Sequence, residues 1–577
     1  MVYSRPMAEG GGLESGAVAR PHTDGSSRGV PAAAESTAAG RWLGLILFIV
    51  VFVAALVPRM FTAGEHVMFD ENLWMERSDN YLDAVTEGEF DRAHSAALFP
   101  IATMPGTPVM VVGAVAHAGY STFDMDPGVP FNESRVGLML SQRLMAGISA
   151  LLIATLAVGV RRWAGDVAAW ITGAILVGEP WLTGLSSQFH TDAFVALFGA
   201  TGLVFMALAF EVPAPRIPTR HPLLMAGLGG ALISLAPLTK LTGLNFGFGA
   251  ITVFALSMWA ARSDRPLLAL RSRQMVAATA GALSMVVLTY TAVIVDPTGQ
   301  WDLLSSSANL APTGQLTFFR GEQTENPSAW FFPYTLALRF TPWLFVGALA
   351  GAGVCGWLSA QRGRALVLLS VALPTMIVLS SSAKKNDRYV LPVLALAAVL
   401  AALAAQGLWD RRQPSGVGHQ HVLGAGVVAT LVLSAWGSTV APAGMMYFSP
   451  LFGGGQGAVD TTWIGNLDAN HLAAREIQRL EGGDCEGVTV SYLTRSLYTR
   501  GSRPLDPYWP DLECNTSNEK GVPPDYVVAY IGEWQKLTED TRDKALRREL
   551  LSVVEVRGIP VFRIWRGGPL PEGGADR

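Results

Sequence analysis

Long apolar runs recur along most of this chain, and they constrain its fold more than any other feature. Each run is close to the ~20 residues that a helix needs to cross the ~30 Å hydrocarbon core of a bilayer. Half of the 577 residues are hydrophobic and only 15% are charged, a balance that is rare in soluble domains. We therefore expect an α-helical polytopic membrane protein with about eleven transmembrane helices. The expected spans lie near residues 42–57, 136–158, 166–182, 192–210, 222–239, 243–260, 275–295, 335–357, 365–381, 389–408 and 422–441.

The polar segments divide the chain into three parts. Residues 1–40 are rich in Gly, Ala and Ser and lack apolar periodicity, which predicts a disordered tail without a signal peptide. Residues 41–441 are expected to form the membrane domain, with long loops at 59–135 and 296–334. Residues 442–577 are polar, and we expect a small α+β domain there. Its predicted strands are "GVTVSYL", "DYVVAYI", "LSVVEV" and "PVFRIW", and its predicted helices lie near 468–480 and 538–550.

Arginines mark alternate short loops and so predict the orientation of the chain. Loops on the cytoplasmic side of a membrane carry an excess of Lys and Arg. The N-terminal tail is then cytoplasmic, whereas the two long loops and the C-terminal domain are extracytoplasmic. We therefore expect a multi-pass protein of the cytoplasmic (plasma) membrane. The arginines concerned are Arg161, Arg162, Arg216, Arg220, Arg262, Arg265, Arg271, Arg273, Arg362, Arg364, Arg411 and Arg412.

One group of cations violates this charge rule. Lys384, Lys385 and Arg388, in "SAKKNDRYVLP", precede a span on the predicted outer face. Cations on that side usually have a partner, and at a membrane surface the natural one is an anion such as a lipid phosphate. The alternative is a solvated loop with no ligand.

Acidic residues fall on the same predicted face. Asp70 and Glu71 follow the first span beside aromatic residues, and a carboxylate at such a boundary can act as a general base. Asp192 opens a later span in "FHTDAF", next to His190, and Lys240 closes another. Taken singly, these acids fit helix N-terminal charges, and a lone histidine is more often structural. Their shared face favours a reaction between an anionic lipid and a solute outside the membrane.

The three cysteines show no CxxC or zinc spacing, and nothing in the sequence indicates nucleic-acid binding. Cys355 lies in an apolar span, where packing is the simplest interpretation. Cys485 and Cys514 lie in the polar C-terminal region, and they can form a disulfide if that region is extracytoplasmic.

Several short motifs, in order, resemble one known group of enzymes. They are "FDE" after the first span, a Pro-Gly-Thr turn in the same loop, "HTDA", "TK" and "KKNDRYVLP". "YFSPLFGGGQGA", "NLDANHLAAREI" and "PDYVVAYIGEW" are similar to the tail of bacterial members. Together these motifs resemble the GT-C glycosyltransferases, in the family 39-like branch related to protein O-mannosyltransferases and to the aminoarabinose transferase acting on lipid A. The resemblance runs from about Trp42 to the end of the chain.

This resemblance implies sugar transfer from a polyprenyl-phosphate donor to a glycan, lipid or protein acceptor at the outer membrane face. Asp70 would be the catalytic base, and Asp192 would orient the acceptor or the sugar. Lys384, Lys385 and Arg388 would hold the donor phosphate, with Lys240 as a helper. Three further residues are carried over as supporting members of the site, namely Glu71 (catalytic), His190 and Tyr389 (substrate-binding).

Two departures from the family pattern affect what the resemblance implies. Met104 stands where relatives often carry a His before the Pro-Gly turn, which weakens a metal site in that loop and leaves a divalent cation open. "GNLDAN" (465–470) replaces a Gly-Glu-Gly-Leu-Asp stretch in the tail that could help to select the acceptor. The alternatives from other classes are a polytopic transporter and a non-catalytic protein that binds lipid-linked glycans. Charges at span ends and the lack of a visible repeat disfavour transport.

Overall fold

The structure is a computed structural model. It describes residues 38–68, 70–91, 106–309, 313–412, 419–440, 443–465, 470–483, 485, 487–493, 503–504, 515–516 and 523–568. The chain divides into two compact units, Met1–Leu43 and Gly44–Arg577, and the features discussed below belong to the second. Of the expected tail at 1–40, only residues 38–40 are described. The motif residues Phe69 and Met104 lie outside the described residues.

The structure confirms an α-helical membrane fold. Within the described residues, eight helices are long and apolar enough to cross a bilayer. They are Gly40–Thr62, Arg135–Trp163, Asp192–Ala209, Pro222–Thr239, Leu241–Ala261, Gln361–Ser381, Asp387–Arg412 and His421–Val440. These spans belong to α1 (Ala38–Thr62), α4 (Arg135–Trp163), α7 (Asp192–Ala209), α8 (Pro222–Thr239), α9 (Phe246–Ala261), α15 (Ser359–Ser381), α16 (Leu391–Arg412) and α17 (His419–Val440).

The three other expected spans are interrupted or shorter. They correspond to α5 (Asp166–Gly178) with α6 (Pro180–Ser186), to α10 (Arg265–Thr289) with α11 (Ala292–Val295), and to α13 (Phe331–Arg339) with α14 (Pro342–Trp357). In two of the three, a proline at the first helical position starts the second helix. The residue before a proline is pushed out of the helical region, so the first helix ends there.

The long loop at 59–135 holds more structure than its sequence predicted. It contains α2 (Glu71–Glu87), α3 (Thr107–Thr122) and a 3₁₀ turn at Phe131–Glu133. Although α3 is apolar, it has only 16 residues, which is too short to read as a span. It packs between α2 and α4 and also touches α8. The loop is therefore a cap built on the ends of the membrane helices.

The second long loop, at 296–334, contains α12 (Pro297–Asn309) and a hairpin of β1 (Thr317–Phe319) and β2 (Glu322–Thr324). The hairpin reaches the C-terminal domain: the backbone N–H of Arg320 donates to the Thr461 carbonyl. This loop therefore ties the two parts of the second unit together.

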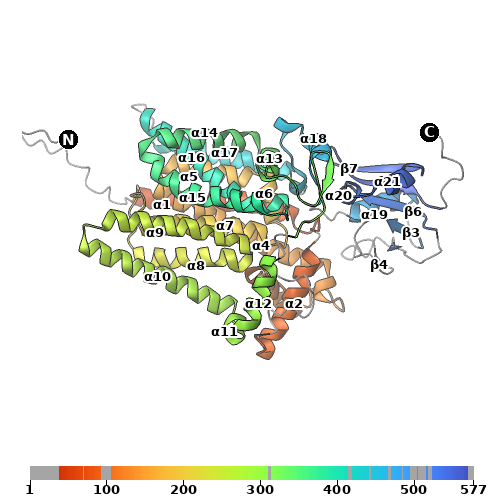
Figure 1. Cartoon of the computed structure of the whole chain (residues 1–577), viewed down its shortest axis with the longest axis horizontal. Coiled ribbons are helices and arrows are strands. Elements are labelled where there is room, and N and C mark those ends of the chain that lie inside the picture. Colours follow the sequence, from red (N-terminus) through yellow and green to blue (C-terminus); the bar gives the residue numbers. More distant parts are fainter. Residues whose placement is uncertain are drawn as a thin grey trace, which may run out of the picture. The chain divides into compact units, whose positions relative to one another are not determined.

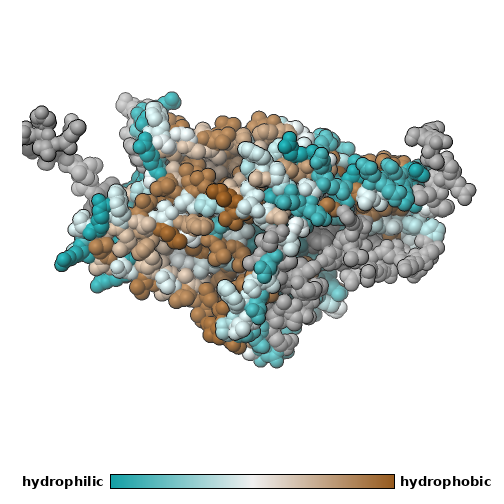
Figure 2. Space-filling model, viewed as in Figure 1, coloured by the Kyte–Doolittle hydropathy of each residue, from teal (hydrophilic) through white to brown (hydrophobic). Residues whose placement is uncertain are grey.

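Two helices, α7 and α16, form the centre of the membrane domain. Nearly every residue of both is buried, and the two pack against each other. A helix that is apolar all round is a buried one, and the many alanines of α16 let its neighbours α5, α14 and α15 approach closely. By contrast, α8 and α10 lie side by side at the edge (Figure 1). Figure 2 shows a broad hydrophobic surface over the helices and hydrophilic residues over the C-terminal strands.

The arginine-rich loops gather at one end of the helices. Arg216 pairs with Asp410, and Arg364 donates from Nε to the Trp163 carbonyl at 3.0 Å and from Nη2 to the Ala214 carbonyl at 2.9 Å. These loops follow α4, α7, α14 and α16, whereas Asp192 and Arg388 stand at the opposite ends of α7 and α16. The predicted sorting of charges to two ends is therefore found.

The C-terminal part is an α+β domain, as predicted. Its described residues form a six-stranded sheet of the order β4-β5-β3-β6-β8-β7, with β3 parallel to β5 and β6, and with β8 antiparallel to β6 and β7. All four predicted strands and both predicted helices are present. The elements are α18 (Gly454–Thr461), α19 (Asn470–Leu480), β3 (Thr489–Tyr492), β4 (Arg503–Pro504), β5 (Asn515–Thr516), β6 (Tyr526–Tyr530), α20 (Ile531–Trp534), α21 (Glu539–Leu546), β7 (Leu550–Val556) and β8 (Ile559–Arg566).

The cysteines behave as the sequence allowed. Cys355 is a free, buried thiol. Cys485 is disulfide-bonded. Cys514, its expected partner, lies outside the described residues.

Candidate functional site

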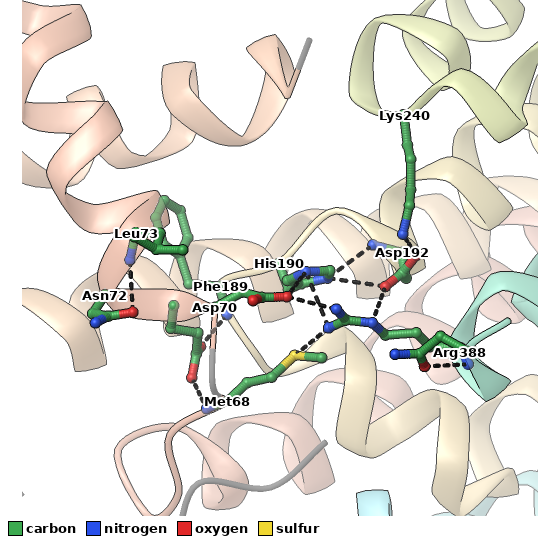
Figure 3. Close-up of polar contacts among 11 residues, drawn as sticks. Met68, Asp70, Asn72, Leu73, Phe189, His190, Asp192, Lys240 and Arg388 are labelled. Carbon is green, nitrogen blue, oxygen red and sulfur yellow. Dashed lines mark hydrogen bonds and ion pairs between the residues drawn. The ribbon is translucent and has the colours of Figure 1, made fainter. Parts of the chain in front are cut away.

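Asp70, Asp192, Lys240 and Arg388 meet at the helix ends opposite the arginine-rich loops. Figure 3 shows the contacts among them and His190. Asp70 is the N-cap of α2, but its side chain makes no capping bond. Asp192 is the first residue of α7, and Lys240 follows the last residue of α8. Arg388 lies in the 3₁₀ turn Asp387–Val390 that leads into α16. Four segments far apart in the sequence therefore supply one cluster.

Arg388 is the centre of this cluster. Its Nη2 donates to Asp70 Oδ2 at 2.5 Å, and its Nε lies 3.4 Å from Asp192 Oδ2. Its Nη1 lies 3.2 Å from His190 Nε2 and 3.6 Å from the Met68 sulfur. A planar guanidinium suits this position because it can face two carboxylates at once.

Asp70 is the more open of the two carboxylates, with 26% of its side chain exposed, against 4% for Asp192. His190 Nε2 lies 3.3 Å from Asp70 Oδ2. Burial alone would raise the pKa of Asp70, but the charge of Arg388 and the hydrogen bonds from His190 and Arg388 outweigh it and hold the pKa well below its ordinary range. Asp70 is therefore ionised and faces the accessible side of the cluster.

Asp192 is enclosed by its partners. Lys240 Nζ donates to its Oδ1 at 2.6 Å, and His190 Nδ1 lies 3.1 Å from its Oδ2. The ammonium of Lys240 also lies 4.2 Å from the centre of the Tyr389 ring, in a cation–π contact. An acid so surrounded can hold Arg388 and His190 in place.

The two lysines of the loop before Arg388 differ. Lys385 is buried, and its ammonium donates to the carbonyls of Pro327 at 2.8 Å and Ser382 at 2.6 Å. Lys384 is half-buried, and the described residues offer its ammonium no hydrogen-bond or ion-pair partner. Burial and the nearby charge of Arg388 lower the pKa of Lys384, whereas Asp70 raises it. Lys384 therefore lies within electrostatic range of both residues and is available to an added anion.

Glu71 lies beside Asp70 in sequence but has a different environment. It is fully buried, and its oxygens accept the backbone N–H of Met68 at 2.5 Å, the amide of Gln142 at 2.9 Å and the backbone N–H of Phe189. These bonds fasten the start of α2 to the turn before α7. In this way Glu71 fixes the separation of Asp70 and His190.

Trp74 packs against His190, and Gly106 in turn packs against Trp74. The Trp74 ring meets the His190 ring edge-on, with 6.2 Å between centroids. Gly106, the N-cap of α3, has φ +64°, and a Cβ there would overlap the Trp74 ring. The Pro-Gly-Thr turn of the sequence is thus the point where α3 approaches Trp74 closely.

A buried ion pair next to Arg388 was missed from the sequence. Arg339 pairs with Asp387, and it also donates to the carbonyls of Met445 at 2.8 Å and Tyr447 at 2.9 Å. It therefore connects the turn that carries Arg388 to the segment entering the C-terminal domain. One signal was available: Arg339 is a lone cation in an otherwise apolar run, and such residues usually have a buried partner.

The cluster is a poor cation site. Both carboxylates already face cations, Arg388 and Lys240, which would repel a metal ion. Among the described residues, no group of three or more His, Cys, Asp or Glu could hold a metal ion.

Fold and site together define a polytopic membrane protein with a partly open acid–cation cluster at its helix ends. No family model and no curated protein match the chain. Solved structures with a similar fold include ArnT from Cupriavidus metallidurans. In the apo state it has a TM-score of 0.48 and 16% identity, covering 92% of this chain and 98% of its own. Bound to undecaprenyl phosphate it has a TM-score of 0.46 and 16% identity, covering 89% and 97%.

The archaeal oligosaccharyltransferase AglB from Archaeoglobus fulgidus, in complex with an inhibitory peptide and a dolichol-phosphate, is also similar. Its TM-score is 0.39 at 15% identity, covering 69% of this chain and 56% of its own. All these scores lie below 0.5, so the likenesses carry no weight for the chemistry of this chain. Its function is inferred from the residues of the site instead.

Proposed function

We propose that the protein is a GT-C glycosyltransferase, which moves a sugar from a polyprenyl-phosphate donor to an acceptor on the outer face of the cytoplasmic membrane. The observation that carries this proposal is the contact between Asp70 and Arg388 on the open side of the cluster, with Lys384 nearby and unpaired among the described residues. It brings together a carboxylate that would serve as the base and two cations that would bind the phosphate. The orientation assumed is the one that the arginine-rich loops predict, with the N-terminus cytoplasmic.

The cations would act on the leaving group. A polyprenyl-phosphate sugar is a phosphodiester with one negative charge, and the phosphate that departs when the bond to the sugar C1 breaks carries two. Cations facing this phosphate are therefore more stabilising after bond cleavage than before it, which lowers the barrier. Arg388 supplies a forked donor, and Lys384 supplies an ammonium that no described residue engages. Lys385, whose ammonium is bonded to two carbonyls, would shape the loop.

Asp70 would take the proton of the acceptor hydroxyl as its oxygen bonds to the sugar C1. Without donor, Arg388 holds Asp70 and makes it a weak base. A phosphate that shares Arg388 would weaken this hold, so Asp70 would gain basicity only when a donor is bound. Attack from the face opposite the phosphate inverts the anomeric centre. A product with the anomeric configuration of the donor, determined by NMR, would contradict this geometry.

The enclosed residues would position the reacting groups. Asp192 and Lys240 would fix Arg388 and His190, and Glu71 would set the place of Asp70. Tyr389 would keep Lys240 beside Asp192. ArnT and AglB were solved with lipid phosphates of the proposed class, but the proposal rests on the contacts of this site.

The test uses the purified full-length protein in lipid nanodiscs. Undecaprenyl phosphate binding and the release of polyprenyl phosphate from mannose- and arabinose-linked donors are measured, with membrane-lipid and cell-wall glycan fractions as acceptors. Arg388→Gln should weaken binding, and Asp70→Asn should slow release by about 10²–10⁴-fold. Asp83→Asn, an exposed aspartate of the same helix, is the matched control and should match the wild type. Binding without turnover of any donor would favour a non-catalytic glycan-lipid binder. If neither is seen, the proposal fails and transport becomes the next assay.

A further inference from the structure

A hollow lies apart from the acid–cation cluster and shares no lining residue with it. Its volume is about 550 Å³, and it is lined by the start of α14, Trp436 of α17, the segment 446–450, the start of α18 and the turn between β7 and β8. Membrane helices thus form one wall and the C-terminal domain forms the other. The proposed glycosyl transfer makes no use of this hollow.

Aromatic rings dominate its wall. Trp343 at the start of α14 meets Trp436 of α17 edge-on, with 4.9 Å between ring centroids. Trp436 in turn meets Tyr447 at 6.2 Å. Trp and Tyr prefer the level of the lipid headgroups, because one side of the ring system is apolar and the other carries a polar N–H or O–H.

The hollow lies at the end of two apolar stripes. On α14, Trp343 is followed at intervals of three residues by Val346 and Leu349, which are 58% and 63% exposed. On α17, Val428 and Val432, both at least 60% exposed, lead at intervals of four residues to Trp436. These spacings put each set on one face of its helix. A face of exposed apolar residues on a membrane helix contacts acyl chains, so the hollow opens where those chains end.

Arg557 supplies the charge. It lies in the two-residue turn between β7 and β8, and its Nη1 donates to the carbonyl of Val440 at 3.2 Å. This is the only hydrogen bond of its side chain to the described residues, so most of its five N–H donors can bind a ligand. Its φ is +55°, a backbone position for which Asn, Asp or Gly would be the usual choice. Arg557 therefore occupies a backbone conformation that most residues with a Cβ avoid.

We propose that this hollow binds an anionic lipid, whose phosphate contacts Arg557 and whose acyl chains lie along the exposed faces of α14 and α17. Charge selects the headgroup, because the hollow offers a cation and apolar or aromatic walls. A neutral glycan would also stack on tryptophan, but it would not need the acyl-chain stripes that lead into the hollow. Inorganic phosphate would find Arg557 alone and bind weakly.

The experiment measures lipid binding, so its result is independent of glycosyl transfer. The full-length protein in detergent is titrated with phosphatidylglycerol or phosphatidylcholine of identical acyl chains, and bound lipid is counted by native mass spectrometry. We expect the wild type to hold one phosphatidylglycerol about tenfold more tightly than phosphatidylcholine, a difference of about 1.4 kcal/mol. Arg557→Gln should remove the preference and Arg557→Lys should keep part of it. Arg547→Gln changes an exposed arginine of the same domain, is the matched control and should keep the full preference.

A second measurement locates the lipid. Brominated phosphatidylglycerol should quench tryptophan fluorescence less in Trp343→Phe/Trp436→Phe than in the wild type, once the signal is corrected for the lost rings. The proposal is overturned if Arg557→Gln keeps the preference while its melting temperature is unchanged. Equal binding of the two lipids by the wild type, displacement of the lipid by millimolar inorganic phosphate, or displacement by a neutral oligosaccharide would overturn it as well.

Discussion

Replacing Asp70 by Asn should separate the two proposed roles of Asp70, which are to act as the base and to pair with Arg388. Asn keeps the shape of the side chain but removes the charge that holds Arg388. As a base is lost, turnover should fall by about 10²–10⁴-fold. The Asp70→Asn variant should also bind undecaprenyl phosphate more tightly than the wild type, because a negative charge next to the incoming phosphate has been removed. A variant that loses activity and gains affinity for the lipid product is the expected signature.

The size of the gain follows from Coulomb's law. Two unit charges about 6 Å apart repel by about 0.7 kcal/mol in water and about 3 kcal/mol at an effective dielectric constant of 20. Asp70 is 26% exposed, so solvent screens part of this repulsion, and we expect about 1–2 kcal/mol. That corresponds to binding that is about 5- to 30-fold tighter.

The assay is a binding titration with undecaprenyl phosphate in nanodiscs of neutral lipid, at low and high salt, alongside donor turnover. Asp83→Asn controls for the loss of one negative charge on α2. Arg388→Gln shows how tightly the protein binds undecaprenyl phosphate when the guanidinium is absent. If Asp70→Asn binds the lipid phosphate more weakly than the wild type, Arg388 does not exchange Asp70 for phosphate and the reasoning is wrong. Full turnover in Asp70→Asn would remove Asp70 from the chemistry altogether.

Two further predictions concern the parts that hold the site. Gly106→Ala should destabilise the protein by about 1–3 kcal/mol, seen as a lower melting temperature, because the new methyl overlaps Trp74 and φ is positive. Gly88→Ala, where φ is +78° but nothing lies within 4 Å, isolates the backbone effect and should cost only about 1 kcal/mol; equal losses would refute the clash. Burial lowers the pKa of His66 to about 3 and that of His471, whose ring lies 5.4 Å away, to about 4. Because these folded-state values lie below the unfolded value near 6.5, stability should be full above about pH 6.5 and fall as the pH drops towards 4. His471→Phe should reduce this loss, measured as melting temperature against pH, and an unchanged profile would contradict the assignment.

Most residues of the acid–cation cluster could be predicted from the membrane face on which each was expected to lie. The arginine-rich loops and the family resemblance both predict that Asp70, His190, Asp192, Lys240 and Arg388 share one face. The structure brings these five together. The sequence could not predict which acid pairs with which cation, because the pairing depends on which helix ends are neighbours in the fold. The sequence likewise gives no reason to distinguish Lys384 from Lys385. In the structure, the ammonium of Lys385 donates to two backbone carbonyls, whereas that of Lys384 has no such partner within the described part of the chain.

What the sequence determined by itself is the class of the protein. Runs of about twenty apolar residues have no stable alternative to crossing a bilayer as helices, since a backbone in hydrocarbon must satisfy its own hydrogen bonds. The strands of the C-terminal domain follow from alternation in the same local way. Only the tertiary structure decided that Arg339 and Asp387 pair, and that Glu71 accepts hydrogen bonds from two backbone N–H groups and the Gln142 amide. It also decided that Arg557 lines one hollow together with the tryptophans of α14 and α17. Such contacts join residues far apart in the chain, or depend on burial, and neither local propensity nor periodicity records distance in the folded chain.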